Sequence, residues 1–293
     1  MSSFANLKRN SKSFESLTKA IESSTMASSD SKQDTRLWQP TVDKAGNGIA
    51  TIRFLPAPSV DGDDALPWIR VFNHGFQGPG GWLIDNCLTT INQKCPVCEH
   101  NSVLWNSGIE ANKEIVRKQK RKLSYISNIL VISDPSNPEN DGQVKLFKYG
   151  KKIFDKITEA MNPEFPDEKA INPFDMWQGA NFKMKIRNVE GYRNYDKSEF
   201  AESSSISNDD ESLEKIWKSE FSLKEFLEEK NFKSYDQIKS RLDKALGLGD
   251  VIPIRSRVTD VSEKEESYLK ETSNISDTDD EDLNYFKKLA EKD

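Results

Sequence analysis

One stretch of the chain, residues 73–98, reads NHGFQGPGGWLIDNCLTTINQKCPVC. It contains all three cysteines of the protein, Cys87, Cys95 and Cys98, together with His74, one of only two histidines. The spacing is His-x12-Cys-x7-Cys-x2-Cys. One imidazole nitrogen and three thiolates complete a tetrahedral zinc shell, and four protein ligands leave no position for water. The stretch therefore predicts one closed, structural zinc site.

The glycine-rich turn at residues 78–81 predicts a hairpin with His74 and Cys87 on its two sides. The CPVC pair that follows can form a tight turn that aims both sulfurs at one point. Two alternatives stay open for this pair, because it is also typical of a redox motif or of plain core thiols. His100 competes with His74 as the fourth ligand, although it follows the pair too closely to turn back easily.

Composition divides the chain into four parts. Hydrophobic residues make up 35% and charged residues 31% of the 293 residues, which is polar for one packed globule, so we expect disordered termini. Three cysteines, all taken by the metal spacing, favour a reducing cytoplasm over a disulfide framework. Neither a secretory signal nor an apolar run long enough to span a bilayer is present in the sequence. The four parts are a basic N-terminal segment (1–21), a flexible linker (22–35), a core (36–250, with the zinc subdomain at about 68–105) and an acidic tail (251–293).

Charge is distributed unevenly along the chain. Residues 260–293 hold 12 acidic and five basic residues, a net of −7, against −6 for the whole protein. Residues 113–156 hold 11 basic and five acidic residues, a net of +6. A basic central region joined to an acidic end predicts a polyanionic partner and a tail that mimics it.

The pattern of apolar residues predicts a mixed, mainly β core. Strands are expected at residues 49–55, 68–72, 82–84, 123–132, 144–149 and 181–188. Helices are expected at residues 151–161 and over much of 213–246, where Ser234 and Gln237 form a capping box. One helix between two of the strands is typical of an oligonucleotide-binding (OB-like) Greek-key barrel, here with an inserted zinc subdomain and C-terminal helices.

Cations and aromatic rings accompany these strands, which is what unpaired nucleic acid requires of a protein. The candidate phosphate-binding cations are Arg53, Lys120, Arg121, Lys122, Lys148, Lys183, Lys185 and Arg187. The candidate base-stacking rings are Trp105, Tyr125, Phe147, Tyr149, Tyr192 and Tyr195. The alternative is that the cations are solvated strand faces and the rings are core residues. Clustering of both kinds between Lys120 and Tyr125 weighs against that alternative there.

Motifs for catalysis are missing from the sequence. A zinc deaminase needs His-x-Glu, whereas Gly75 and Phe76 follow His74. We find no Walker-type glycine loop, nucleophile elbow or His-Glu-x-x-His motif. The sequence therefore predicts a protein that is not an enzyme. A zinc hydrolase stays as a third class, which a water-bound metal would identify.

The N-terminal segment has its own pattern. Leu7, Phe14, Leu17 and Ile21 fall near helical spacing among the cations Lys8, Arg9 and Lys12, so a short basic amphipathic helix is expected. Such a segment would order only against a partner. A frayed polar terminus is the alternative.

A series of short motifs covers roughly residues 38–200: DKAGNG with IRFLP (43–56), NHGF (73–76), CPVC (95–98), NILV (128–131), DP…PEN (134–140), GKKIFDKI (150–157), GANF (179–182) and GYRNYD (191–196). Together, and in this order, they resemble the single-stranded DNA-binding (helix-destabilising) proteins of T-even-type bacteriophages.

The resemblance implies a barrel with a zinc subdomain and a DNA cleft between them, lined by Arg121, Lys122, Tyr125, Tyr192 and Tyr195. It implies that the N-terminal segment, with Lys8, Arg9 and Lys12, contacts neighbouring copies of the protein on DNA. It also implies that the acidic tail binds phage replication, recombination and repair proteins.

We therefore expect a cooperative, sequence-nonspecific protein that coats and protects unpaired DNA in phage replication, recombination and repair, in the cytoplasm of an infected bacterium. It would bind one structural zinc ion and no membrane. A zinc-stabilised RNA-binding or translation-regulatory module is the alternative, because contacts to a 2′-hydroxyl are invisible in sequence.

Overall fold

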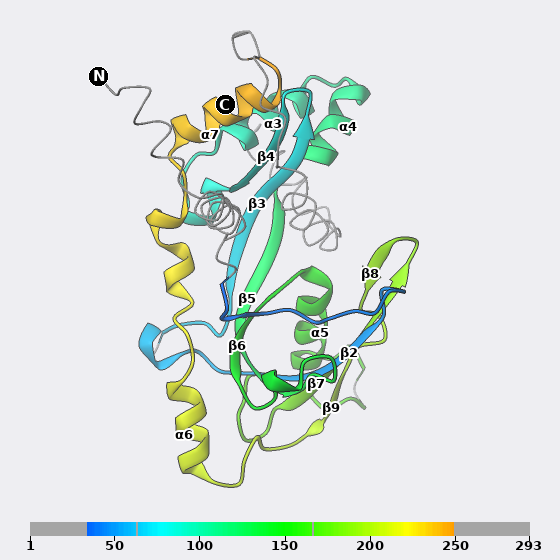
Figure 1. The fold of residues 1–293 in the computed structure, drawn as a ribbon, viewed down its shortest axis with the longest axis vertical. Coiled ribbons are helices and arrows are strands. Elements are labelled where there is room, and N and C mark those ends of the chain that lie inside the picture. The colour runs from blue at the N-terminus through cyan, green and yellow to red at the C-terminus, as the bar shows by residue number, and fades with distance from the viewer. Residues whose placement is uncertain (1–33, 63, 166, 249–293) are drawn as a thin grey trace, which may run out of the picture. The chain divides into compact units, whose positions relative to one another are not determined.

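The computed structural model describes residues 34–62, 64–165 and 167–248 (Figure 1). Our predictions for residues 1–33 and for the acidic tail lie outside these ranges. The described part is mainly β, as expected. Its strands are β1 (Leu37–Trp38), β2 (Gly48–Phe54), β3 (Ile69–Gly78), β4 (Gly81–Asn86), β5 (Lys122–Ser133), β6 (Val144–Tyr149), β7 (Ala180–Val189), β8 (Tyr192–Asn194) and β9 (Glu199–Ser203).

The sheet is antiparallel and is organised around β5. Neighbouring strands follow the order β6–β5–β2–β7–β8, with β9 beside β7 and the β3–β4 hairpin beside β5. The first half of β5 pairs with β3, from Ile126 opposite Ile69 to Lys122 opposite Asn73. Its second half pairs with β2. Over the described residues this path is an open sheet, and closure into a barrel stays a prediction.

The buried apolar residues of the described part form two clusters, one within the sheet and one beside the β3–β4 hairpin. The β-core cluster is built from inward residues of β2, β5, β6 and β7, among them Ile52, Phe54, Ile129 and Phe182. The hairpin cluster contains Leu83, Val97, Val116, Ile238, Leu242 and the three cysteines. Residues 124–131 of β5 are buried without alternation, since elements cover both faces of that strand.

Helices complete the two ends of the molecule. They are α3 (Pro96–Asn106), α4 (Glu110–Gln119), α5 (Lys151–Met161), α6 (Asp210–Lys218) and α7 (Tyr235–Ala245). The helix at 151–161 and the capping box of α7 are confirmed: Ser234 Oγ accepts from the Gln237 backbone N–H, and Gln237 Oε1 accepts from the Ser234 N–H. The CPVC turn is the first turn of α3, because the fixed φ of Pro96 suits the first helical position.

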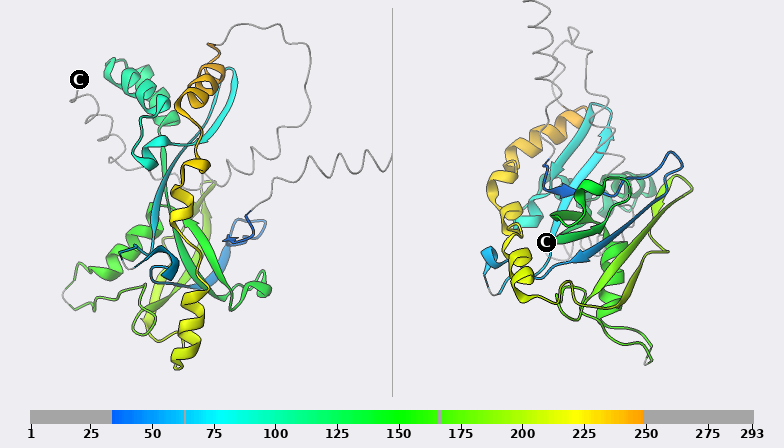
Figure 2. Two further views of the ribbon diagram at one scale, coloured as in Figure 1. Left: turned by 90° about the vertical axis from the view of Figure 1, so that its left-hand side faces the viewer. Right: turned by 60° about the horizontal axis from the view of Figure 1, so that its bottom comes forward.

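A connecting segment, residues 219–234, joins α6 to α7 and contains the 3-10 turns η4 (Lys224–Leu227) and η5 (Glu229–Asn231). Figure 2 shows this segment, in yellow, running from the β-core towards the β3–β4 hairpin. At the core end, the Asn128 side chain exchanges two hydrogen bonds with the Phe221 backbone. The region predicted as helical between 213 and 246 is therefore two helices and a linker.

The hairpin end of α7 packs very closely on the β3–β4 turn. The Gly80 N–H donates to the Ala245 carbonyl at 2.8 Å, and a Cβ at Gly80 would lie 1.8 Å from the Lys244 carbonyl oxygen. Only glycine fits this approach. Asp85, on β4, adds a buried carboxylate that Arg241 Nε contacts at 2.6 Å and that Lys233 also pairs with. These contacts fix α7 against the hairpin.

Candidate metal centre and nucleic-acid interface

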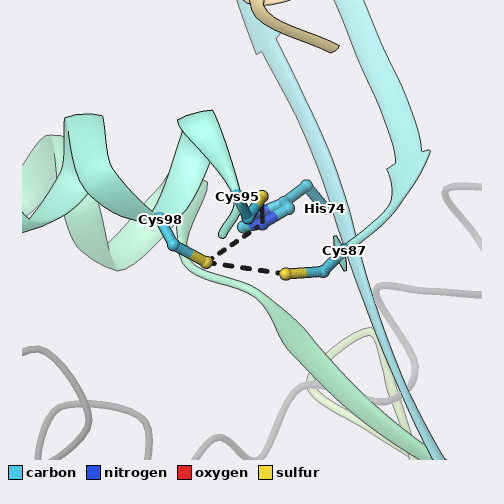
Figure 3. A group of neighbouring side chains, drawn as sticks. All are labelled: His74, Cys87, Cys95 and Cys98. Atoms are coloured by element: carbon cyan, nitrogen blue, oxygen red, sulfur yellow. Dashed lines mark hydrogen bonds between the residues drawn. The ribbon is translucent and has the colours of Figure 1, made fainter. Parts of the chain in front are cut away.

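The four predicted metal ligands meet in one buried cluster. His74 comes from β3, Cys87 follows β4, and Cys95 and Cys98 lie at the start of α3. Their ligand atoms all lie within 4.8 Å of one another. Figure 3 shows the imidazole and the three thiols pointing towards a common centre. His100 is not part of this cluster, so the structure groups the set that the sequence favoured.

The distances in this cluster suit a tetrahedral ion. His74 Nε2 is 3.6 Å from Cys95 Sγ and 3.5 Å from Cys98 Sγ, and the sulfurs of Cys87 and Cys98 are 3.5 Å apart. Zinc bonds of about 2.3 Å to sulfur and about 2.0–2.1 Å to nitrogen would separate nitrogen from sulfur by about 3.6 Å and two sulfurs by about 3.8 Å. The grouping therefore fits a metal ion of zinc's size.

The second ring nitrogen of His74 makes a hydrogen bond of its own. His74 Nδ1 lies 3.1 Å from the backbone carbonyl oxygen of Gln119, the last residue of α4. A carbonyl only accepts, so Nδ1 carries a proton, and Nε2 is the ring nitrogen that faces the cluster. A metal-binding histidine commonly makes this type of hydrogen bond.

The thiols are also prepared for a cation. Burial opposes ionisation of Cys87, but hydrogen bonds from Cys95, Cys98 and Thr89 outweigh it and hold the pKa of Cys87 well below its usual value. The hydrogen bonds to Cys87 and Cys95, with burial, raise the pKa of Cys98 well above its usual value. Three buried thiols therefore do not all ionise by themselves, whereas a bound cation would stabilise all three thiolates.

Thr89 contacts the cluster from outside, and no sequence pattern predicted its role. Thr89 Oγ1 is 3.1 Å from Cys87 Sγ and accepts a hydrogen bond from Arg121 Nη1 at 2.6 Å. The Arg121 guanidinium lies over the Phe72 ring, 4.0 Å from its centroid, and the residue is 8% exposed. Arg121, predicted as a DNA contact, thus also contacts the surroundings of the metal cluster.

Three of the candidate stacking rings lie inside the β-core. Tyr125, Phe147 and Tyr149 are buried and pack on one another. Tyr125 also stacks on Phe154, with ring centroids 3.9 Å apart. The side of β6 that carries Phe147 and Tyr149 is the inner one, so these rings pack on core neighbours in this structure, and their role in base stacking stays a prediction.

The remaining rings differ in exposure. Tyr192, at the tip of the β7–β8 hairpin, is 57% exposed. Tyr195 is half-buried against the β-core cluster. Trp105 is half-buried against the hairpin cluster, and the cationic groups of Lys113 and Arg117 lie 5.8 and 5.9 Å from its ring. Tyr192 is therefore the most accessible of the six predicted rings.

The outer face of β7 carries a row of cations, as its alternation predicted. Lys183, Lys185 and Arg187 are exposed, while the residues between them are buried. Lys185 Nζ pairs with Glu199 at 2.8 Å, and Arg187 makes a two-point contact with Asp196. Both pairs are exposed to solvent, so little free energy opposes their exchange for phosphates.

Other predicted cations are less accessible. Arg53 is fully buried, and its Nη2 donates to the backbone carbonyls of Asp175 (2.7 Å) and Ser204 (2.9 Å). Burial lowers the pKa of Arg53 to about 10. Loops from distant parts of the chain cover the outer face of β2 at this point, and the role of Arg53 at phosphate stays a prediction. Lys120, Lys122 and Lys148 are half-buried, and burial lowers the pKa of Lys122.

The candidates for self-association, Lys8, Arg9 and Lys12, lie outside the described residues. In the part of the chain that the structure covers, no helix is long and apolar enough to cross a membrane.

Known DNA-binding proteins are similar to this chain in sequence. A family model described as "gp32 DNA binding protein like" matches residues 46–246. Proteins named single-stranded DNA-binding protein from Enterobacteria phages T2 and T4 are each 39% identical to this chain over 226 residues, which is 74% of this chain and 72% of theirs. A protein of that name from Enterobacteria phage RB70 is 41% identical over 99 residues, covering 32% of this chain and 79% of its own.

Proposed function

The chain belongs to the gp32-like family of DNA-binding proteins, and from that premise we propose that it binds single-stranded DNA. One observation carries the proposal, namely the match of this family over residues 46–246, together with relatives that are named for single-stranded DNA binding. The exposed cations of β7 and the exposed ring of Tyr192 support it.

Binding would be electrostatic and stacking in character, and not catalytic. Cations that replace the counterions of a strand give affinity without sequence preference. A ring with a free face adds roughly 1–3 kcal/mol for each stacked base. We place seven of the predicted residues at this interface, namely Lys120, Arg121, Lys122, Lys183, Lys185, Tyr192 and Tyr195, with Trp105 at its margin. A protein that binds single strands and not duplex shifts melting towards single strands by mass action.

Zinc is the ion we propose for the buried cluster, with His74, Cys87, Cys95 and Cys98 as its ligands. The donor set, the burial and the separations of the ligand atoms support this choice. Bound there, zinc would supply a structural cross-link among β3, the end of β4 and α3. Four protein donors fill its shell, so it would offer no site for hydrolysis.

The finer features of the fold and its context are part of the proposal. The position of α5 between β6 and β7 supports an OB-like barrel. The basic segment at residues 1–21 would contact neighbouring copies on DNA. The acidic tail, residues 251–293, would bind replication, recombination and repair proteins of a phage in the cytoplasm of its host.

Titration of the protein with fluorescent oligothymidylate, matched oligouridylate and duplex DNA at several salt concentrations tests this function. We expect preference for single-stranded DNA and a log–log salt slope of about −0.7 for each phosphate neutralised. Affinity that is independent of salt, or equal for duplex, would contradict the proposal. Clear preference for the RNA oligomer would favour the RNA-binding alternative.

A further inference from the structure

The cationic run at residues 120–122 is attached to the metal cluster through its backbone. It begins directly after Gln119, whose carbonyl oxygen lies 3.1 Å from His74 Nδ1. It continues into β5, where Lys122 lies opposite Asn73, the neighbour of His74 in β3. A ligand of the cluster and the predicted DNA-contacting run therefore share one hydrogen-bonded frame.

A second attachment runs through side chains and has a defined direction. Arg121 Nη1 lies 2.6 Å from Thr89 Oγ1, which lies 3.1 Å from Cys87 Sγ. A guanidinium has no acceptor, so Arg121 donates and Thr89 accepts. The single hydroxyl proton of Thr89 is then left for the sulfur of Cys87. The chain of donors therefore points from Arg121 to Cys87.

Thr89 thus stands between a ligand atom and a cation that the family resemblance assigns to DNA. Packing on Phe72 holds the guanidinium of Arg121 in one plane, and the Thr89 hydroxyl sets its rotation within that plane. A fixed guanidinium fork binds phosphate with less loss of side-chain entropy than a mobile one. Residues that hydrogen-bond to metal ligands also raise metal affinity, commonly by 10–100-fold.

Building on the proposed function, we propose that Thr89 is a positioning residue that links the metal cluster to single-stranded DNA binding through Arg121. An ordered cluster fixes Thr89, Thr89 orients Arg121, and a phosphate on Arg121 favours the same arrangement. Linkage is reciprocal, so metal must strengthen DNA binding by the same factor by which DNA strengthens metal binding.

The test measures zinc affinity of the full-length protein by equilibrium competition with a chromophoric chelator, without and with saturating short oligothymidylate. We expect the oligonucleotide to tighten zinc binding by at least about fivefold in the wild-type protein. The ratio of zinc affinity with the oligonucleotide to zinc affinity without it measures the linkage. In Thr89→Val, which keeps the shape but loses the hydroxyl, this ratio should fall to about one, and zinc affinity itself should fall about tenfold. Thr89→Ser restores the hydroxyl and should restore the ratio.

Thr158→Val provides the matched control, since Thr158 is an exposed threonine on α5 whose hydroxyl donates to the Phe154 carbonyl at 3.1 Å. It should keep the wild-type ratio. Arg121→Lys, which removes the fork but keeps the charge, should reduce the ratio even if Thr89→Val does not fold. A wild-type ratio of one, a full ratio in a folded Thr89→Val, or, where that variant does not fold, a full ratio in Arg121→Lys would overturn the linkage while the proposed function stands. Failure of the wild-type protein to bind the oligonucleotide would instead sink the proposed function, and this inference with it.

Discussion

The β-core cluster and the hairpin cluster differ in the side chains that fill them. In the β-core, aromatic rings pack edge to face, as Phe54 does with Tyr149 and Phe174 at centroid distances of 5.6 and 5.7 Å. The hairpin end has a smaller apolar cluster, which includes the three cysteines. Large rings bury enough apolar area to stabilise a fold by themselves, whereas a small cluster generally needs a metal or another staple.

The connecting segment shows the same contrast along a single piece of chain. At the core end it is held by neutral hydrogen bonds to Asn128 and by the Asp61 carboxylate, which accepts from Ser222 Oγ and the Leu223 N–H. At the hairpin end it is held by the ion pair between Lys233 and the buried Asp85 carboxylate. We expect the stability of the hairpin end to depend on metal and salt, and the stability of the core end to depend on pH.

Removing the zinc ion that we propose should have the largest effect on the difference between the two regions. Structural zinc sites contribute on the order of 10 kcal/mol to folding, so chelation, or Cys98→Ser, should unfold the hairpin end and leave the β-core folded. Hydrogen exchange would detect this as loss of protection in β4, α3 and α7, with β2 and β7 still protected. Equal loss of protection in both regions would show that the β-core is not an independent unit.

Glu220 should make the stability of the core end depend on pH. It is buried beside Asp61, and burial first, then the Asp61 charge, raises the pKa of Glu220 to about 9. The folded state keeps a proton that the unfolded chain loses above about pH 4.5, so stability should fall as pH rises from there towards 9.

The matching variant is Glu220→Gln, which holds a neutral group at every pH. It should be more stable than wild type at pH 8, by a margin on the order of a few kcal/mol that disappears near pH 4. Denaturant unfolding at the two pH values measures this margin. The same margin at both values would rule out titration of Glu220 as the cause.

Asp85→Asn tests the hairpin end. The Asp85 side chain is 2% exposed, while Lys233 and Arg241 are about half exposed and regain water when the pair is lost. We therefore expect a loss of about 2 kcal/mol, below the range for two fully buried partners. Unfolding monitored at the hairpin should shift, and high salt should reduce the difference between wild type and variant. Lys239→Ala, which removes an exposed pair with Asp243, serves as the control.

Substitutions at Tyr192 and Tyr149 test an accessible ring against a core ring. Tyr192→Ala should weaken binding of single-stranded DNA about tenfold, from the loss of one stacked base, and leave stability unchanged. Tyr149→Phe should lose the 2.8 Å hydrogen bond to Ser127 Oγ, costing about 1 kcal/mol of stability, with DNA affinity unchanged. Oligonucleotide titration and denaturant unfolding measure the two effects. Reversed effects would place the stacking surface in the β-core.

Much of the fold follows from local pattern, and so does the grouping of the metal ligands. The strict alternation of β7 predicted its buried and exposed faces, and four residues with metal spacing come together because the hairpin and α3 fold locally. Alternation shows which residues share a face but not which face meets water. That is why Phe147 and Tyr149 fall inside and why Arg53, covered by residues far along the chain, is buried. The Thr89–Arg121 contact spans 32 residues and has no local signal.

β5 runs through both regions without interruption, since it pairs with β3 near Lys122 and with β2 near Ser133. Adding or deleting one residue inside this strand would turn every later side chain to the opposite face. A loop-length change would be tolerated between β5 and β6, around residues 135–142, but nowhere within β5 itself. Insertion scanning should therefore find the least permissive positions of the protein along this one strand. These include positions near Ser133, at the end of β5 that does not lie beside the metal ligands.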